Sequence, residues 1–262
     1  MSNRKVIFFD IDETIFRAKY GVCASTKIAI RELIANGHIP VINTGRARCM
    51  IFPSLINLGF KDILSGAGSL VEHENEVLYK HDLPLSEIDE MVDSFYEFGF
   101  YPIPEGHEKL YYDPSITDEK YHYLFDKLYY EVKDSMFPIE KGNTHAMKAC
   151  GLITKDSDIL GLKKKYSDKY DICDHHGKLL ELIPKGLSKQ SAMKVLLKRL
   201  NIGREDTYAF GDSDNDIPMI EYAGVGVAMG NACEVCKNAS DYVTNDLADD
   251  GVYKALMHFG LI

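Results

Sequence analysis

The sequence lacks any run of about 18 apolar residues, the length that a membrane-spanning helix requires. Residues 1–4 lead straight into a short apolar segment, without the longer apolar run and cleavage site of a secretory signal. Positive charge is also scarce, since 30 Lys and Arg residues stand against 40 Asp and Glu, a formal net charge of -10. Nucleic acids and anionic membranes bind to clustered positive charge. We therefore expect a cytoplasmic protein with neither kind of partner.

The cysteines are too few and too dispersed over 262 residues to form a disulfide framework. The six of them are Cys23, Cys49, Cys150, Cys173, Cys233 and Cys236. The last two have the spacing of a CxxC motif, but no second pair accompanies them and their segment does not open a thioredoxin-like unit. We therefore expect reduced thiols, and for this pair two small side chains one helical turn apart.

The composition is that of a compact globular protein, with 45% hydrophobic and 27% charged residues. A chain of 262 residues is long enough for one large domain or two modest ones. We find no internal repeat and no low-complexity tract. Because the chain is acidic, any site for an anionic ligand requires a local cation, from a metal ion or a well-placed lysine.

The first part of the chain has the pattern of a parallel sheet covered by helices. Residues 5–9 are almost continuously apolar, which is typical of a strand buried on both faces. A helical pattern over 25–35 and a second apolar run over 39–42 follow, and this order predicts a right-handed crossover. We also predict a helix over 48–58, a strand over 62–64 and a hairpin that pairs 70–71 with 77–78.

The character of the sequence changes between about Leu83 and about Ile183. Helices there alternate with short strands such as 147–153, and the segment is rich in tyrosine and proline. The tyrosines are Tyr111, Tyr112, Tyr121, Tyr123, Tyr129 and Tyr130. The parallel pattern then resumes, with a helix over 188–200, strands over 207–210 and 225–229, and a last helix after Gly251. We predict an α/β fold with one domain inserted into another.

Polar residues follow three of the predicted strands at the point where each strand ends. They are Asp10 and Asp12, Thr44 and Gly45, and the acidic run 212–216. In open parallel sheets, ligands bind at the carboxyl ends of the strands. Two carboxylates about 4 Å apart repel by roughly 4 kcal/mol at an effective dielectric near 20, and oxygen ligands suit a hard ion such as Mg²⁺. A lone Asp caps a helix or turn by default, but three such strand ends favour a metal and phosphate site.

The run 212–216 also resembles the opening of a calcium-binding EF-hand loop. That loop requires Gly at its sixth position and Glu at its twelfth, where this sequence has Ile217 and Ala223. We therefore exclude an EF-hand.

Lys189 is the candidate for the local cation. Ser188 is a typical N-cap, so Lys189 falls on the first helical turn, where a positive charge opposes the helix dipole. A bound anion reverses this penalty, because helix N-termini and lysines both bind phosphate. The alternative is a solvated surface lysine, which the neighbouring motifs disfavour.

Four motifs, in order, resemble those of the haloacid dehalogenase-like hydrolases. They are residues 9–15 (FDIDETI), 43–46 (NTGR), 184–189 (PKGLSK) and 210–216 (FGDSDND). Residues 227–232 (VAMGNA) and 249–252 (DDGV) are similar to the Cof-type (IIB) phosphatase subfamily. The resemblance implies a Rossmann-like, doubly wound parallel-sheet core over 1–82 and 184–262, with an inserted α/β cap domain over 83–183.

The resemblance also implies roles for individual residues. Asp10 resembles the nucleophile that forms an aspartyl-phosphate, and Asp12 resembles the general acid/base. The residues implied to bind the phosphoryl group are Thr44, Gly45, Lys189 and Asn215. The implied Mg²⁺ ligands are Asp10, the backbone carbonyl of Asp12, and Asp212, with Asp216 in support.

Two positions depart from the family pattern. The family usually has Gly after the second Asp of the first motif, whereas this chain has Glu13, which restricts the backbone and adds a negative charge beside the site. We expect activity to survive, with altered phosphate affinity or metal preference. Residues 66–68 (GAG) stand where relatives tend to have an Asn-Gly turn.

The resemblance implies a phosphatase that acts on a small phosphorylated metabolite, as a monomer or weak homodimer. Among possible substrates, the resemblance favours sugar phosphates first, followed by nucleotides and pyridoxal phosphate. A phosphotransferase or mutase with the same nucleophile, and a non-catalytic phosphometabolite-binding protein, are the alternatives. Candidate substrate contacts in the cap are Tyr111, Asn143, His145 and His175, although surface or core positions are the default for each. His175 and His176 lack partners at metal-ligand spacing.

Overall fold

The computed structural model describes residues 4–125, 130–175 and 177–262, and it divides the chain into two compact units. The first unit comprises Met1–Gly45, Pro53–Lys80 and Ser188–Ile262, and the second comprises Arg46–Phe52 and His81–Leu187. The division predicted from sequence placed residues 46–52 with the core, whereas here they group with the second unit. The assignment of a hydrolase core and a cap to these segments stays a prediction.

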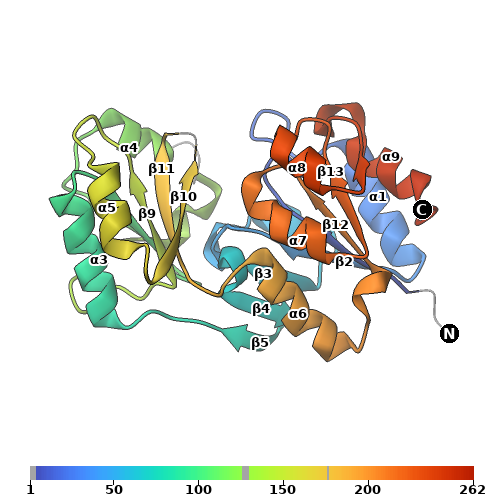
Figure 1. Ribbon diagram of the computed structural model, residues 1–262, viewed down its shortest axis with the longest axis horizontal. Coiled ribbons are helices and arrows are strands. Elements are labelled where there is room, and N and C mark those ends of the chain that lie inside the picture. Colours follow the sequence, from blue (N-terminus) through green and yellow to red (C-terminus); the bar gives the residue numbers. More distant parts are fainter. Residues whose placement is uncertain (1–3, 126–129, 176) are drawn as a thin grey trace. The chain divides into compact units, whose positions relative to one another are not determined.

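The first unit is built on one sheet with the strand order β14-β13-β12-β1-β2-β3-β4-β5 (Figure 1). Neighbouring strands are parallel except for β4, which is antiparallel to both β3 and β5. The strands are β1 (Val6–Phe9), β2 (Ile39–Asn43), β3 (Asp62–Ser65), β4 (Leu70–His73), β5 (Glu76–Lys80), β12 (Thr207–Gly211), β13 (Val225–Ala228) and β14 (Tyr242–Val243). The predicted parallel sheet is confirmed. The predicted hairpin is also present, but its register differs, since Leu70 pairs with Lys80 and Val71 with Tyr79.

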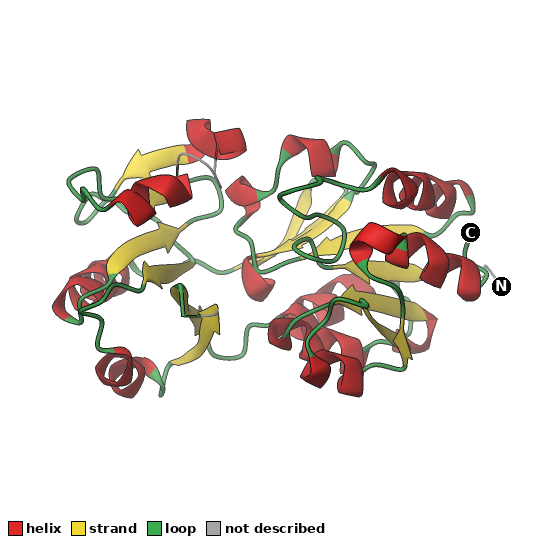
Figure 2. Cartoon of the chain, turned by 90° about the horizontal axis from the view of Figure 1, so that it is seen from above, coloured by secondary structure: helices red, strands yellow, loops and turns green. Residues whose placement is uncertain are grey.

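Helices lie on both sides of this sheet (Figure 2). Helix α1 packs with α9, and α6 packs with α7. The helices of the first unit are α1 (Ala24–Ala35), α2 (Pro53–Ile56), α6 (Lys189–Leu200), α7 (Ile217–Tyr222), α8 (Glu234–Ala239) and α9 (Gly251–His258). Helices on both faces of a mostly parallel sheet define the doubly wound α/β class, and the predicted class is confirmed.

The carboxyl ends of β1, β2 and β12 lie next to one another at the centre of the sheet. All four residues of β1 are buried, and Phe9 is in register with Ile42 of β2 on one side and Phe210 of β12 on the other. A strand buried on both faces needs apolar residues at every position, which explains its continuous apolar sequence. The residues that follow β1, β2 and β12 therefore leave the sheet side by side.

One predicted helix is wrong. Instead of a continuous helix over 48–58, the chain forms a short 3-10 turn at Arg48–Met50 and then α2, which begins at Pro53. Proline disfavours helical backbone in the residue before it and is well tolerated at the first position of a helix. The break before Pro53 has this cause.

The second unit has its own sheet, with the order β10-β11-β9-β6-β7-β8. Its strands are β6 (Tyr101–Glu105), β7 (Leu110–Tyr112), β8 (Met136–Pro138), β9 (Lys148–Leu152), β10 (Tyr170–His175) and β11 (Leu179–Pro184), and its helices are α3 (Leu85–Glu97), α4 (Glu119–Tyr123) and α5 (Ile159–Tyr166). Apolar side chains of α3 and α5, such as Phe95 and Leu162, pack on Ala149 and Leu182 of the sheet. Tyr129 lies outside the described residues.

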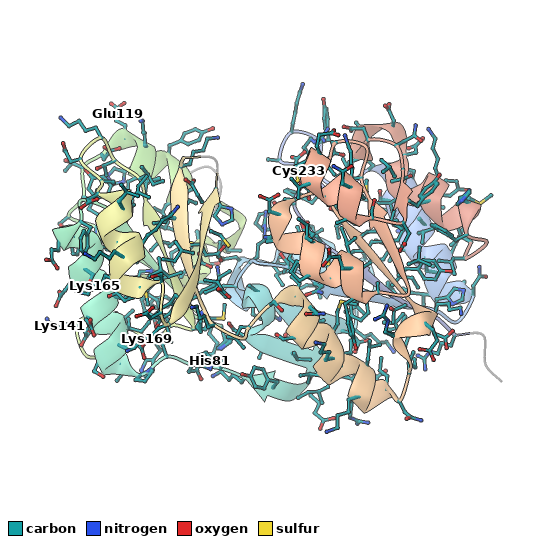
Figure 3. All side chains as sticks on the ribbon, viewed as in Figure 1. His81, Glu119, Lys141, Lys165, Lys169 and Cys233 are labelled. Atoms are coloured by element: carbon teal, nitrogen blue, oxygen red, sulfur yellow. The ribbon has the colours of Figure 1, made fainter. Side chains whose placement is uncertain are left out.

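Helices α3 and α5 are also joined by polar contacts. Lys165 of α5, which is labelled in Figure 3, donates to Ser94 Oγ of α3 over 2.7 Å, and the Tyr166 hydroxyl donates to the same atom over 2.9 Å. The Ser94 hydroxyl in turn donates to the backbone oxygen of Glu90 at 2.7 Å. These contacts fix the pair of helices over one face of the sheet. Within the described ranges, no helix is long and apolar enough to cross a membrane.

A buried charged network joins the strands of the second unit. Lys148 of β9 lies 2.7 Å from Glu105 of β6 and also contacts Glu181 of β11. Glu181 in turn lies 2.8 Å from His175, and the Cys150 thiol donates to Glu105 over 3.0 Å. Burial alone raises the pKa of Glu181, but Lys148 and His175 outweigh it and bring that pKa down to about 2. Glu181 and Lys148 are therefore both charged, and the charge of each depends on its partners.

We predict that Lys148→Met lowers the free energy of unfolding by about 3–5 kcal/mol, because it leaves the buried Glu105 without its cation and Glu181 with His175 alone. Chemical denaturation monitored by circular dichroism measures the loss. The control is Lys141→Met, which removes an exposed lysine 2.9 Å from Asp93 and should change stability by less than about 1 kcal/mol. Equal effects of the two substitutions contradict the importance of the buried network.

Candidate functional site

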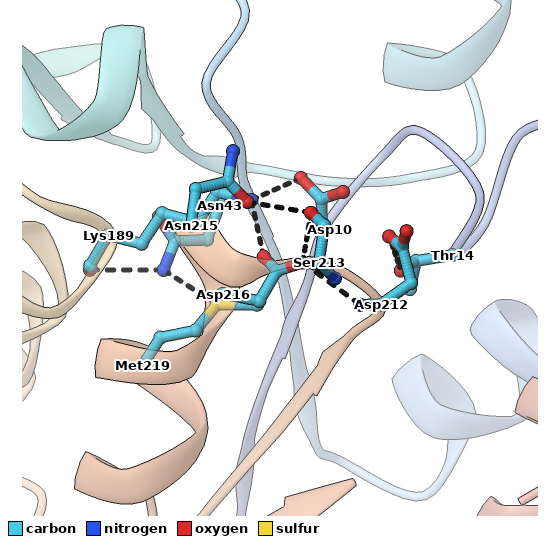
Figure 4. A network of polar contacts seen from close by, with 9 residues as sticks. All are labelled: Asp10, Thr14, Asn43, Lys189, Asp212, Ser213, Asn215, Asp216 and Met219. Atoms are coloured by element: carbon cyan, nitrogen blue, oxygen red, sulfur yellow. Dashed lines mark hydrogen bonds and ion pairs between the residues drawn. The ribbon is translucent and has the colours of Figure 1, made fainter. Parts of the chain in front are cut away.

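Polar side chains from three strand ends meet at the carboxyl edge of the first-unit sheet (Figure 4). Asp10 follows β1, and its backbone nitrogen donates to Phe210 of β12 over 3.0 Å. Thr44 follows β2 and donates through its backbone to Leu64 of β3 over 2.9 Å. Asp10 and Thr44 are 5% and 1% exposed. Sheet hydrogen bonding thus continues into the site and orders its residues.

Lys189 is the buried cation of the site. Ser188 caps α6, and it forms reciprocal hydrogen bonds with Ser191 that place Lys189 on the first helical turn. The Lys189 ammonium lies 2.6 Å from Asp10 Oδ1 and 2.5 Å from Asp216 Oδ1, and the residue is only 2% exposed. Burial disfavours the charged amine, yet the two carboxylates outweigh it and raise the pKa of Lys189. Its charge is therefore secured by two aspartates.

Asp216 organises the loop after β12. While one of its oxygens contacts Lys189, Oδ2 accepts hydrogen bonds from the backbone nitrogens of Asp212 and Ser213 over 2.9 and 3.1 Å. The Ser213 hydroxyl oxygen also lies 3.2 Å from Oδ2. Asp216 is fully buried. Asp216 therefore holds both the backbone at Asp212 and the ammonium group of Lys189 in place.

Three carboxylates form a compact group at this edge. One oxygen each of Asp10, Asp212 and Asp216 lies within 4.8 Å of the others. Burial, opposed by Lys189 but reinforced by the neighbouring aspartates, raises the pKa of Asp10 well above its usual value. Burial and Asp216 raise the pKa of Asp212 to about 7. Closely spaced carboxylates that resist ionisation are the donor set that a hard divalent cation stabilises, so these residues fit Mg²⁺.

Asp12 and Glu13 lie in the loop that continues from β1. Asp12 is exposed, in contrast to Asp10. Glu13 has a left-handed backbone with φ 59°, a conformation that costs a residue other than glycine about 1 kcal/mol or more. The next residue, Thr14, donates its hydroxyl to Asp212 Oδ1 over 3.2 Å. Glu13 thus occupies the position where the motif usually has glycine, and its backbone has a conformation that glycine would adopt without strain.

Asn215 and Gly45 approach each other closely. Asn215 Oδ1 accepts from the Ser213 hydroxyl over 2.9 Å and from Lys189 over 3.4 Å. A Cβ atom added at Gly45 would lie 3.6 Å from Asn215 Nδ2, which is an ordinary van der Waals contact. The four residues predicted to bind phosphate therefore come from neighbouring elements, and their roles stay predictions.

Gly68 marks a close approach between the 66–68 turn and the start of α6. It has φ 98°, and a Cβ there would lie 2.5 Å from the backbone oxygen of Ser188. Ala67 beside it also has a positive φ of 52°. Glycine is therefore required where this turn packs on the N-cap that precedes Lys189.

Sequence reasoning missed two polar residues of the site. The hydroxyl of Thr14 contacts Asp212, and the Asn43 amide donates to the backbone oxygen of Lys189 over 3.1 Å. Asn43 is fully buried, so its amide holds the first turn of α6 against β2. Both residues stand inside the quoted motifs, and a polar residue at the end of a buried strand was the available signal.

The candidate substrate contacts of the second unit all have partners within that unit. The Tyr111 hydroxyl accepts from His145 N over 3.2 Å, Asn143 donates to Glu140 over 2.8 Å, and His175 pairs with Glu181. Their predicted contact with substrate stays a prediction. His176 lies outside the described residues.

The cysteines are free thiols. Cys233 is exposed beside Asp214, whereas Cys236 is buried. Burial, reinforced in the first case by Asp214, raises the pKa of both thiols, which disfavours the reactive thiolate.

Comparison with known proteins gives a consistent result. A family model described as haloacid dehalogenase-like hydrolase matches residues 7–256. The protein YkrA of Bacillus subtilis (strain 168) is 33% identical, over 98% of each chain. A phosphoglycolate phosphatase of Methanobrevibacter smithii is 29% identical, over 99% of this chain and 100% of that protein. A solved structure of a HAD subclass IIB sugar phosphatase, BT4131, is similar with a TM-score of 0.83 and 26% identity, over 98% of this chain and 100% of that chain.

We predict that the metal-free protein loses stability as pH rises from about 4 to 7. Asp212 has a pKa of about 7 in the folded protein and about 3.9 when unfolded. The folded state therefore binds the extra proton throughout this window. Raising the pH removes this proton, and the stability lost over the whole window is on the order of 4 kcal/mol. Mg²⁺ should reverse the loss by binding the ionised form.

Thermal melts at pH 5 and pH 8, in a chelator or in Mg²⁺, measure this linkage. Asp212→Asn should flatten the pH dependence of the chelated protein. Asp171→Asn, at an exposed position of the second unit, serves as the control and should leave the dependence intact. The same slope in wild type and Asp212→Asn contradicts the prediction.

Proposed function

The chain belongs to the haloacid dehalogenase-like hydrolases, and we propose that it is a Mg²⁺-dependent phosphatase that transfers the phosphoryl group of a small metabolite first to Asp10 and then to water. The observation that carries this proposal is the contact of Lys189 with Asp10 and Asp216, beside Asp212. It combines a nucleophilic carboxylate with positive charge at the edge of the sheet where ligands bind.

The reaction that this arrangement supports has two steps. In the first, a carboxylate oxygen of Asp10 attacks phosphorus, the bond to the leaving oxygen breaks, and Asp12 donates a proton to that oxygen. In the second, Asp12 accepts a proton from water as the water oxygen attacks phosphorus, which releases inorganic phosphate and restores Asp10. The exposure of Asp12 suits a group that exchanges protons with an incoming alcohol or water.

The remaining residues bind and stabilise charge. Thr44, the backbone at Gly45 and Asn215 are proposed to hold the phosphoryl oxygens, and Lys189 to neutralise their charge. Asp216 keeps Lys189 in place through its 2.5 Å contact. Asp10, the carbonyl of Asp12, and Asp212 would hold Mg²⁺. When bound, the ion supplies electrostatic stabilisation to the transferring phosphoryl group.

The wider assignment is part of the same proposal. The first unit is proposed as the hydrolase core, and the inserted segment as the cap that selects the substrate. The relatives support phosphomonoesters of small metabolites, since one is named for phosphoglycolate and a solved structure for sugar phosphates. Sugar phosphates are therefore the first class to screen, ranked by kcat/KM.

We predict that the purified protein hydrolyses para-nitrophenyl phosphate with Mg²⁺, and that Asp10→Asn reduces kcat by at least about 1,000-fold because the nucleophile is lost. The absorbance of released nitrophenol measures turnover. A matched control is Asp241→Asn, since the Asp241 side chain accepts a 2.8 Å hydrogen bond from Gly226 N that an asparagine oxygen can replace. No turnover by correctly folded wild type, or full turnover by Asp10→Asn, would falsify the proposed function.

We also predict that Asp12→Asn affects the two steps differently. Nitrophenol is a good leaving group that needs little protonation, whereas the attack of water on phosphorylated Asp10 needs a base, so the second step should slow by about 100- to 10,000-fold. A burst of nitrophenol and a phosphorylated protein in the intact mass spectrum should result. A uniform slowing with no phosphorylated protein argues against Asp12 as the base.

A further inference from the structure

Glu13 is the residue of the site loop whose conformation most needs an explanation. It has φ 59° and stands between Asp12, the proposed acid/base, and Thr14, which contacts Asp212. Its backbone nitrogen donates to the Phe16 carbonyl over 2.8 Å, and its own carbonyl accepts from Asn231 over 2.9 Å. The peptide groups on both sides of Glu13 are therefore held.

The Glu13 side chain is held as well, through Arg17. Arg17 Nε lies 2.6 Å from Glu13 Oε2, and Nη1 of the same guanidinium lies 3.2 Å from Asp246 Oδ1. The Arg17 side chain is 21% exposed, and those of Glu13 and Asp246 are 46% and 33% exposed, so the three side chains form a partly exposed network of ion pairs. Arg17 thus joins the loop after β1 to a loop more than 220 residues later in the chain.

Asp246 belongs to a segment that is itself fixed beside the site. Its side chain caps a short 3-10 turn by accepting from Ala248 N over 2.7 Å. Asn231, which donates to the Glu13 carbonyl, accepts from Leu247 N over 3.1 Å. The loop after β1 is therefore attached to this segment at two points, one ionic and one through Asn231.

We propose that Glu13, Arg17 and Asp246 form an ionic clamp in which Glu13 is a positioning residue for Asp12 and Thr14. Glycine reaches a left-handed conformation without strain. In this chain a glutamate does so because its carboxylate is held by Arg17, which is in turn held by Asp246. The clamp fixes the peptide groups that set the direction of Asp12 on one side and of the Thr14 hydroxyl on the other. This inference rests on the proposed function of Asp12.

The test compares variants that open the clamp at different points. Arg17→Met removes the bridge, Glu13→Gln removes one charge, and Asp246→Asn removes the other while keeping an oxygen that can cap the 3-10 turn. Each should lower kcat for para-nitrophenyl phosphate by about 10- to 100-fold, since small misplacements of reacting groups have effects of this size. KM should change less than about twofold, and Arg17→Lys should restore part of kcat.

The chain contains a matched control for the unusual backbone. Glu74 also has a positive φ, 48°, and its carboxylate lies 3.7 Å from Lys61 at the exposed β4–β5 turn. Glu74→Gln should leave kcat unchanged. In addition, the double variant Glu13→Gln/Arg17→Met should be no slower than the slower single variant, because both remove the same interaction.

A second measurement separates this inference from the proposed function. In a calorimetric titration, Mg²⁺ should bind to Arg17→Met at least about fivefold more weakly than to wild type, because the carbonyl of Asp12 is a proposed ligand. If wild type turns over substrate and Arg17→Met retains its kcat, the clamp is overturned and the phosphatase stands. If folded wild type shows no turnover, the phosphatase fails, and the Mg²⁺ titration alone decides: equal affinities overturn the clamp, and weaker binding in Arg17→Met supports it.

Discussion

The buried contact of Lys189 with Asp10 and Asp216 is the interaction on which the site depends. Removing an ammonium from water costs several kcal/mol unless opposite charges accompany it, and here two carboxylates lie within 2.6 Å of it. These three residues come from the start of α6, the end of β1 and the loop after β12. The same electrostatics that make the buried lysine tolerable therefore bring three distant segments together, and they hold Asp10, the proposed nucleophile, in place.

Sequence patterns predicted the parts of the fold that depend on local physics. Burial, capping and strand ends have local sequence signatures. A few residues were therefore enough to identify the apolar run of β1, the serine cap before Lys189 and the acidic run after β12. The helix predicted over 48–58 is wrong because Pro53 disfavours helical backbone in the residue before it, which the apolar periodicity of the segment does not reveal. Of the site itself, the convergence of strand ends was predictable, whereas the roles of Thr14 and Asn43 in orienting their neighbours depend on packing.

Non-local charge pairing was the part that sequence could not supply. Lys148, Glu105 and Glu181 stand on separate strands, and each alone is indistinguishable from a solvated charge on a strand surface. Only the register of β6, β9 and β11 brings them together in the interior. The same holds for Glu13: its departure from the family motif was visible, but its link through Arg17 to Asp246 joins segments far apart in the chain.

The strand order has a consequence for how the protein emerges from the ribosome. Strand β1 is synthesised first, yet one of its two neighbours, β12, begins at Thr207, after the whole of the inserted unit. Until then β1 has one unpaired edge, and Asp10 lacks Asp216, which follows β12 in the chain. Domains generally fold as units during synthesis. The inserted segment at 81–187 can therefore become compact before β12 has been added to the sheet of the first unit. The surroundings of Asp10 are thus completed only after the inserted segment has been made.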